Sequence, residues 1–150
     1  MASVAPIRLD QCNLVVGDVE ASRAFYVKLG VDFGDQRDPV WSRHHVSAVP
    51  RPGTTIDLDL DSMSFAPHWN EGWPGGPGVV IGFRVDTRQE VDDLVAALAA
   101  DGVPVQQPPW DAFWGARYAV VTDPDGNAVG IMSPRDDAYR GEPPDPEVPR

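Results

Sequence analysis

The chain has 150 residues, the length of one ordinary domain or of two small repeated modules that share a core. Hydrophobic residues make up 42% of it, which is enough for a sizeable core and excludes disorder along the whole chain. The formal net charge of -11 disfavours binding to nucleic acid or to an anionic membrane, and would attract cationic small molecules. The alternative is that the acidity only keeps the protein soluble.

The single cysteine, Cys12, excludes an internal disulfide and a metal site built from clustered cysteines. It falls within an apolar strand, where a buried and unreactive thiol is the usual outcome. No run reaches the roughly 18 apolar residues that a membrane span needs. The first residues lack the basic and then apolar stretch of a secretory signal. We therefore expect a reduced, cytoplasmic protein.

The first part of the chain predicts a strand, a helix and three further strands. These are a strand at 7–16, a helix from Asp18 to Gly30, and strands at 31–33, 40–49 and 55–61. Asp18 is the expected N-cap of the helix, and Gly30 is expected to end it. In the last strand apolar and acidic residues alternate strictly, so that Asp57, Asp59 and Asp61 share one face.

A connector rich in Gly, Pro and Trp follows at 63–78, and the same order of elements then begins again. The second set is a strand at 79–85, a helix from Asp86 to Gly102, and strands at 103–105, 117–122 and 128–133. The segment Asp123-Pro124-Asp125-Gly126-Asn127 predicts a hairpin turn between the last two strands. The proline-rich, charged tail at 134–150 is expected to be loosely ordered.

This repeat predicts the fold class. Asp18 and Gly30 are matched by Asp86 and Gly102 at a distance of roughly 70 residues. The sheet of one module is too small to close alone, so we predict an α+β fold in which two βαβββ modules form a cup-shaped, mostly antiparallel sheet with helices outside. One domain would span 1–150, with modules at about 7–62 and 79–133.

The early helix, with its Phe25-Tyr26 and Leu29-Gly30 pairs, and the late DPDGN turn resemble the vicinal oxygen chelate superfamily over about residues 7–134. That superfamily includes glyoxalase I, extradiol dioxygenases, fosfomycin-modifying enzymes and bleomycin-resistance proteins. The resemblance implies a divalent metal in the cup, but its usual ligand positions fall on or near Gln11, Val80 and Gly130, and only Asp59 offers an oxygen of a usual kind. A transition metal needs three or more placed donors, so we expect neither a metal nor another cofactor.

Within the superfamily, the segment at 109–121, His44 and the segment at 67–69 resemble the metal-free antibiotic-binding resistance proteins, such as the mitomycin-binding protein. In that subgroup a planar drug is stacked between aromatic and imidazole side chains at a dimer interface. The resemblance implies a homodimer whose partner is a small molecule, an aromatic antibiotic or natural product, with no nucleic-acid or membrane partner. Sequestration of that molecule is the predicted function.

The candidate ligand-binding residues combine aromatic, imidazole and charged side chains. Tryptophan offers a flat, rigid surface for planar ligands, and all five tryptophans are expected in loops or at strand ends, with Trp110 on a stiff loop after two prolines. If the aspartate face lines the cup, its carboxylates favour a cationic ligand and raise one another's pKa. The candidates are Trp110, Trp114, His44, Asp59, Asp57, Trp69, Arg117, Tyr118 and Trp41.

Alternatives stay open for these residues and for the function. In the alternative interpretation, the tryptophans seal the core or a subunit interface rather than contact a ligand. The aspartates of the strand at 55–61 would then face solvent rather than the cup. His44 and His45 point to opposite faces of a strand, so only one faces the cup, and the resemblance favours His44. The rival functions are a metal-independent isomerase, cyclase or lyase that uses Asp59 or His44 as acid and base, and a regulatory module that binds a protein. No GxSxG elbow, P-loop or GxGxxG motif supports nucleophilic or nucleotide chemistry.

Overall fold

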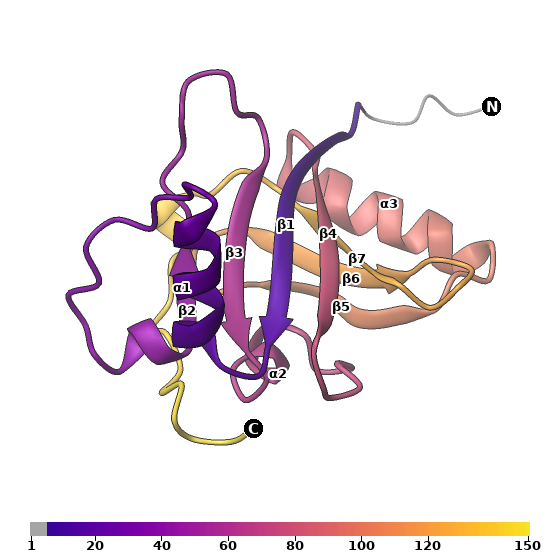
Figure 1. The fold of residues 1–150 in the computed structure, drawn as a ribbon. Coiled ribbons are helices and arrows are strands. Elements are labelled where there is room, and N and C mark those ends of the chain that lie inside the picture. The colour runs from indigo at the N-terminus through magenta and orange to yellow at the C-terminus, as the bar shows by residue number, and fades with distance from the viewer. Residues whose placement is uncertain (1–5) are drawn as a thin grey trace.

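A seven-stranded sheet forms the frame of the protein in the computed structural model, which describes residues 6–150 (Figure 1). Its strands are β1 (Arg8–Val16), β2 (His45–Ser47), β3 (Asp57–Ser62), β4 (Gly78–Arg84), β5 (Val105–Asp111), β6 (Arg117–Thr122) and β7 (Ala128–Met132). The α-helices are α1 (Val19–Lys28), α2 (Ala66–Trp69) and α3 (Arg88–Ala100), and the 3-10 helices are η1 (Trp41–Arg43) and η2 (Asp137–Tyr139).

The two halves of the sheet repeat one pairing scheme, which confirms the predicted α+β fold of repeated modules. The strand order is β2-β3-β1-β4-β7-β6-β5. In each half the first strand pairs in parallel with the last, β1 with β3 and β4 with β7, and the halves join through the antiparallel pair β1–β4. Figure 1 shows β4 alongside β1, whereas β5, β6 and β7 run across these strands, with α1 and α3 flanking the two ends of the sheet.

Alternation along the strands directs one set of side chains toward α1 and α3 and the other set toward the opposite face of the sheet. Leu58 and Leu60 of β3 pack with α1, whereas Ala119 and Val121 of β6 pack with α3. Successive strand residues point to opposite faces, so the residues between them face away from both helices. That second face holds a core cluster of its own, which includes Val80 of β4.

The helix signals in the sequence are confirmed, with one shift. The Asp18 carboxylate accepts a hydrogen bond from the Ala21 backbone N–H at 3.0 Å and caps α1. The cap of α3 is Thr87 rather than Asp86, because Thr87 and Glu90 form a reciprocal capping box. Gly30 and Gly102 follow the two helices with positive φ angles of 97° and 86°, a conformation that favours glycine.

The predicted strand at 31–33 is wrong, and the predicted strand at 40–49 is too long. Residues 31–33 form no strand, and Phe33 is buried against α1 and β3, so its hydrophobicity reflects packing. Residues 41–43 form η1, because the Asp38 carboxylate accepts from the backbone N–H groups of Val40 and Trp41 and starts a helical turn. Only His45–Ser47 remains extended.

Three further segments differ from the sequence prediction. The strand expected at 103–105 begins only at Val105, as β5, and runs to Asp111. It continues through Pro108 and Pro109 because it is an edge strand with register shifts and needs no donor there. The connector contains the short helix α2. The tail is packed rather than loose: Gly141 N–H donates to the Phe113 carbonyl, and Pro146 is buried.

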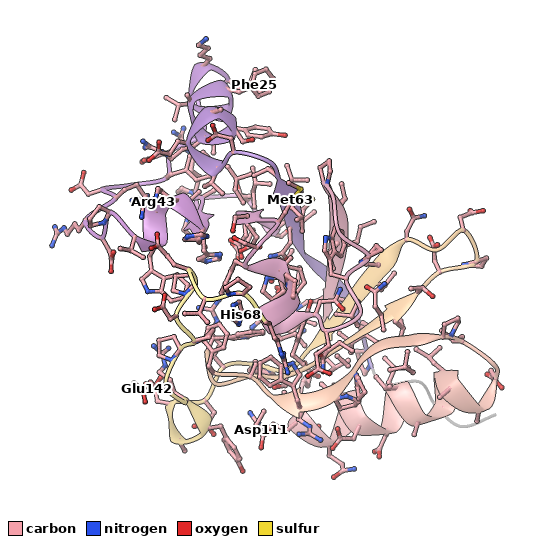
Figure 2. All side chains as sticks on the ribbon, turned by 90° about the horizontal axis from the view of Figure 1, so that it is seen from below. Phe25, Arg43, Met63, His68, Asp111 and Glu142 are labelled. Atoms are coloured by element: carbon pink, nitrogen blue, oxygen red, sulfur yellow. The ribbon has the colours of Figure 1, made fainter. Side chains whose placement is uncertain are left out.

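Figure 2 shows this C-terminal segment running from Glu142 along the side of Arg43 and His68. Arg43 forms an ion pair with Glu147, and His68 Nε2 lies 2.9 Å from the Val148 carbonyl oxygen. The tail therefore joins η1 to α2. No helix within residues 6–150 is both long enough and apolar enough to cross a membrane.

Leu60→Ala should lower the free energy of unfolding by about 2–5 kcal/mol, because Leu60 is 0% exposed and its loss leaves a cavity between α1 and the sheet. Urea unfolding measures the change. Leu29→Ala is the matched control, since Leu29 is 67% exposed and its loss should change stability by less than about 0.5 kcal/mol. Equal losses in the two variants would contradict this packing.

Candidate functional site

An open cavity of about 190 Å³ lies on the face of the sheet opposite α1 and α3. It has an aromatic wall and a polar floor, and we use these two names below. The aromatic wall consists of Trp41, Phe65, Trp69, Phe113, Trp114 and Tyr118. The polar floor consists of Gln11, Asn13, His45, Ser47, Asp59 and Asp61. Met132 and Arg135 complete the lining.

Edge-to-face ring packing fixes the aromatic wall. Trp114 meets Phe113 and Tyr118 with ring centroids at 5.0 and 5.3 Å, the distances of favourable aromatic pairs. Phe113 and Trp114 are carried by the turn between β5 and β6, which closes at Gly115 with φ of 96°. A Cβ at Gly115 would lie 2.7 Å from the Asp136 carbonyl oxygen, so glycine lets the tail hold this turn.

The polar floor is a chain of hydrogen bonds across three adjacent strands. On β3, the Asp61 carboxylate is 1% exposed and accepts from Asn13 Nδ2 of β1 at 3.0 Å. Its other oxygen lies 2.6 Å from His45 Nδ1 of β2. His45 Nε2 in turn lies 3.2 Å from Ser47 Oγ. A buried charge needs such partners, so Asp61 has both of its oxygens satisfied.

The second buried carboxylate, Asp59, is the less compensated of the two. It is 5% exposed and accepts a hydrogen bond from Gln11 Nε2. Burial raises the pKa of Asp59 above its ordinary 3.8, the charge of His45 opposes this shift and that of Asp61 adds to it. Hydrogen bonds from the side chains of Ser47 and Gln11 also oppose the shift. Asp59 is therefore the floor carboxylate whose ionisation a bound cation would favour most.

Burial disfavours a charged imidazole at His45, but the charge and hydrogen bond of Asp61, with the charge of Asp59, outweigh it. Together they raise the pKa of His45 to about 9, although Arg135 opposes the shift. Burial also raises the pKa of the Tyr118 phenol, and the charges of Asp61 and Asp59 raise it further. At neutral pH the floor thus holds an imidazolium, and the wall holds a neutral phenol.

The residues at the positions where the resemblance implies metal ligands have other neighbours in this structure. Gln11 directs its amide N–H at Asp59, and Val80 is a fully buried core residue. At Gly130 an added Cβ would lie 2.8 Å from the Tyr118 hydroxyl, so the phenol occupies the space of a ligating side chain. Within residues 6–150, no group of three or more His, Cys, Asp and Glu is placed to hold a metal ion.

Five of the nine candidate residues from the sequence line this cavity: Trp41, Trp69, Trp114, Asp59 and Tyr118. Of the pair Arg117 and Tyr118, Tyr118 faces inward. The Arg117 guanidinium forms ion pairs with Asp92 at 2.9 Å and Asp111 at 3.2 Å near the start of α3. Asp57 is exposed at the outer end of β3, beyond the cavity.

Trp110 and His44 also lie outside the lining, for different reasons. Trp110 is on β5, not on a loop, and stands behind Trp114 with centroids 5.9 Å apart. Its indole N–H is buried without a partner in the described part of the chain. His44 precedes β2, and its Nδ1 lies 2.9 Å from Ser62 Oγ. Because β2 begins at His45, it is His45, and not His44, that lines the cavity.

Several lining residues are not among the candidates from the sequence, including His45, Ser47, Asp61 and Phe113. The alternation of β3 already carried the signal for Asp61, which shares a face with Asp59. Choosing between His44 and His45 required the starting residue of β2, which η1 determines. Cys12, expected to be buried, is half-buried; burial and the charge of Asp59 raise the pKa of its thiol.

Asp61→Asn should lower the pKa of His45 from about 9 to near or below its ordinary 6.5, because burial still disfavours the imidazolium while the main opposing charge is lost. An NMR titration of the imidazole measures this. In the unmodified protein, the stabilisation from charged His45 is full below pH 6.5 and disappears as the pH rises through about 9. Asp57→Asn is the control. An unchanged His45 pKa in Asp61→Asn would refute the pairing.

Known proteins share this architecture. The sequence matches the Glyoxalase/Bleomycin resistance protein/Dioxygenase superfamily over residues 8–131, whereas no curated protein matches it. A member of that superfamily from Vibrio splendidus 12B01 has a TM-score of 0.56 at 19% identity, covering 86% of this chain and 100% of that one. Methylmalonyl-CoA epimerase from Mycobacterium tuberculosis has a TM-score of 0.56 at 17% identity, covering 92% and 94%.

A variant of homoprotocatechuate 2,3-dioxygenase from B. fuscum has a TM-score of 0.62 at 23% identity, and the match covers 91% of this chain but 35% of that one. At these identities the likeness to solved structures concerns the fold alone. The family match is broader, because it extends over most of the sequence. This chain therefore belongs to the Glyoxalase/Bleomycin resistance protein/Dioxygenase superfamily.

Proposed function

We propose that the protein binds a planar aromatic small molecule in the cavity, with a basic group directed at Asp59, and that it sequesters an antibiotic or a similar natural product. The observation that carries this proposal is one cavity with aromatic rings on one side and buried carboxylates on the other. Ligand pockets typically combine an apolar lining with a few placed polar groups.

The aromatic wall supports a flat ligand. Indole and phenyl rings bury much apolar area at a small entropic cost, since few of their torsions must be fixed. Contacts among the rings hold Phe113 and Trp114 before any ligand arrives. A pre-ordered wall lowers the cost of binding.

The charges of the floor support a basic group on that ligand. Asp61 is neutralised by its pairing with His45, so an ionised Asp59 leaves one net negative charge on the floor. A cation beside Asp59 would replace the solvation that burial removes. The cavity residues named above all belong to one chain.

Trp114→Ala should weaken binding of the planar cation N-methylquinolinium by about 1–3 kcal/mol, because it removes the central ring of the wall. Isothermal titration calorimetry gives the affinity, with one ligand expected per chain. Trp73→Ala is the matched control, since Trp73 is a partly buried indole outside the cavity lining. Equal affinity in Trp114→Ala and the unmodified protein would place the site elsewhere.

Asp59→Asn should abolish the preference for N-methylquinolinium over neutral quinoline, whereas Asp57→Asn, on the same strand face but outside the cavity, should retain it. In the unmodified protein, affinity for the cation should fall as the pH drops through the raised pKa of Asp59, because protonation removes the attracting charge. Calorimetry across that range measures both effects. A preference that survives in Asp59→Asn would exclude this carboxylate as the partner of the cation.

A further inference from the structure

Three side chains of the polar floor are arranged as a nucleophile, a base and the group that orients the base. Asp61 Oδ1 lies 2.6 Å from His45 Nδ1, and His45 Nε2 lies 3.2 Å from Ser47 Oγ. A carboxylate on one imidazole nitrogen and a hydroxyl on the other is the arrangement that activates serine in acyl transfer. It is recognised by geometry, so it needs no particular sequence motif.

Strand pairing holds Asp61, His45 and Ser47 in place, and we call these three residues the relay. His45 and Ser47 are two residues apart on β2 and therefore share a face, and His45 is paired in register with Asp61 on β3. Asp61 is fixed further by Asn13 on β1. The carboxylate thus determines which imidazole nitrogen points at the hydroxyl.

The surroundings of Ser47 supply the two other requirements, access and a stabilising positive charge. Ser47 is exposed and lines the cavity, so a bound molecule can reach its hydroxyl. Arg135 lines the same cavity, its charge acts on His45, and among residues 6–150 it forms no ion pair closer than 4.0 Å. A free guanidinium can stabilise the negative oxygen that develops when a carbonyl is attacked.

We propose that Ser47 is a nucleophile that accepts the acyl group of an aromatic ester bound in the cavity. The choice of an aromatic ester rests on the proposed function, whereas the relay itself does not. Asp61 is a positioning residue for His45, and Arg135 supplies positive charge to the same cavity.

The reaction is balanced without a metal or a redox partner. Ser47 Oγ attacks the ester carbonyl carbon, a C–O bond forms, and the hydroxyl proton passes to His45 Nε2. The bond to the aromatic alcohol then breaks, and its oxygen takes the proton from His45. The products are acylated Ser47 and the alcohol. Water repeats the two steps to release the carboxylic acid and free Ser47.

The test is acetylation by p-nitrophenyl acetate, followed as p-nitrophenolate release and located by peptide mass spectrometry. Acetyl should appear on the peptide that contains Ser47, and Ser47→Ala should remove it. His45→Gln should slow the acetylation of Ser47 by about 100-fold or more. Ser22→Ala and His68→Gln are the matched controls and should react like the unmodified protein.

The pH profile separates the relay from a structural effect. The base must be neutral, so the rate should rise until the pH exceeds about 9, the pKa of His45 beside Asp61, Asp59 and Arg135. Asp61→Asn should slow the reaction and move this rise to lower pH, which a loss of folding alone would not do. Thermal unfolding of each variant checks that it folds.

Acetylation absent from Ser47, or equally fast in His45→Gln, would overturn the proposal. Binding of N-methylquinolinium distinguishes the two ideas. If Ser47 stays unmodified while the cation binds, acyl transfer is wrong and the binding function stands. If Ser47 is acetylated while the cation does not bind, the proposed ligand class is wrong and the nucleophile stands.

Discussion

The buried carboxylate of Asp61 is the group on which the arrangement of the cavity depends. A buried charge without partners costs several kcal/mol, so its two oxygens require Asn13 on β1 and His45 on β2. Those two bonds tie three adjacent strands together on the cavity face. They also orient His45 toward Ser47 and neutralise one of the two floor charges, which leaves Asp59 as the carboxylate available to a ligand.

The residues at the positions where the resemblance implies metal ligands have packing and hydrogen-bonding roles in this structure. Tyr118 fills the space beside Gly130, Val80 belongs to the core, and Gln11 binds Asp59. The same alternation that buries Leu60 under α1 turns Asp59 and Asp61 to the opposite face. One strand thus builds a helix-covered core on one side and a charged floor on the other.

The sequence predicted the parts of the fold that local signals control. The Asp18 cap of α1, the glycines that follow α1 and α3, and the alternation of β3 all have short-range causes, and the structure agrees with them. The sequence did not predict which histidine faces inward, because that depends on a 3-10 turn started by Asp38. Nor did it place Trp110 behind Trp114, since this follows from the pairing of an edge strand that contains two prolines.

The proposed function requires that planar ligands lie between the aromatic wall and the polar floor. Intermolecular nuclear Overhauser effects between N-methylquinolinium and the protein locate the bound ring. We expect contacts from the ligand ring to Phe113, Trp114 and Tyr118, with the charged end nearest β3. Contacts to Trp73 or to the outer faces of α1 and α3, with none to the wall, would contradict it.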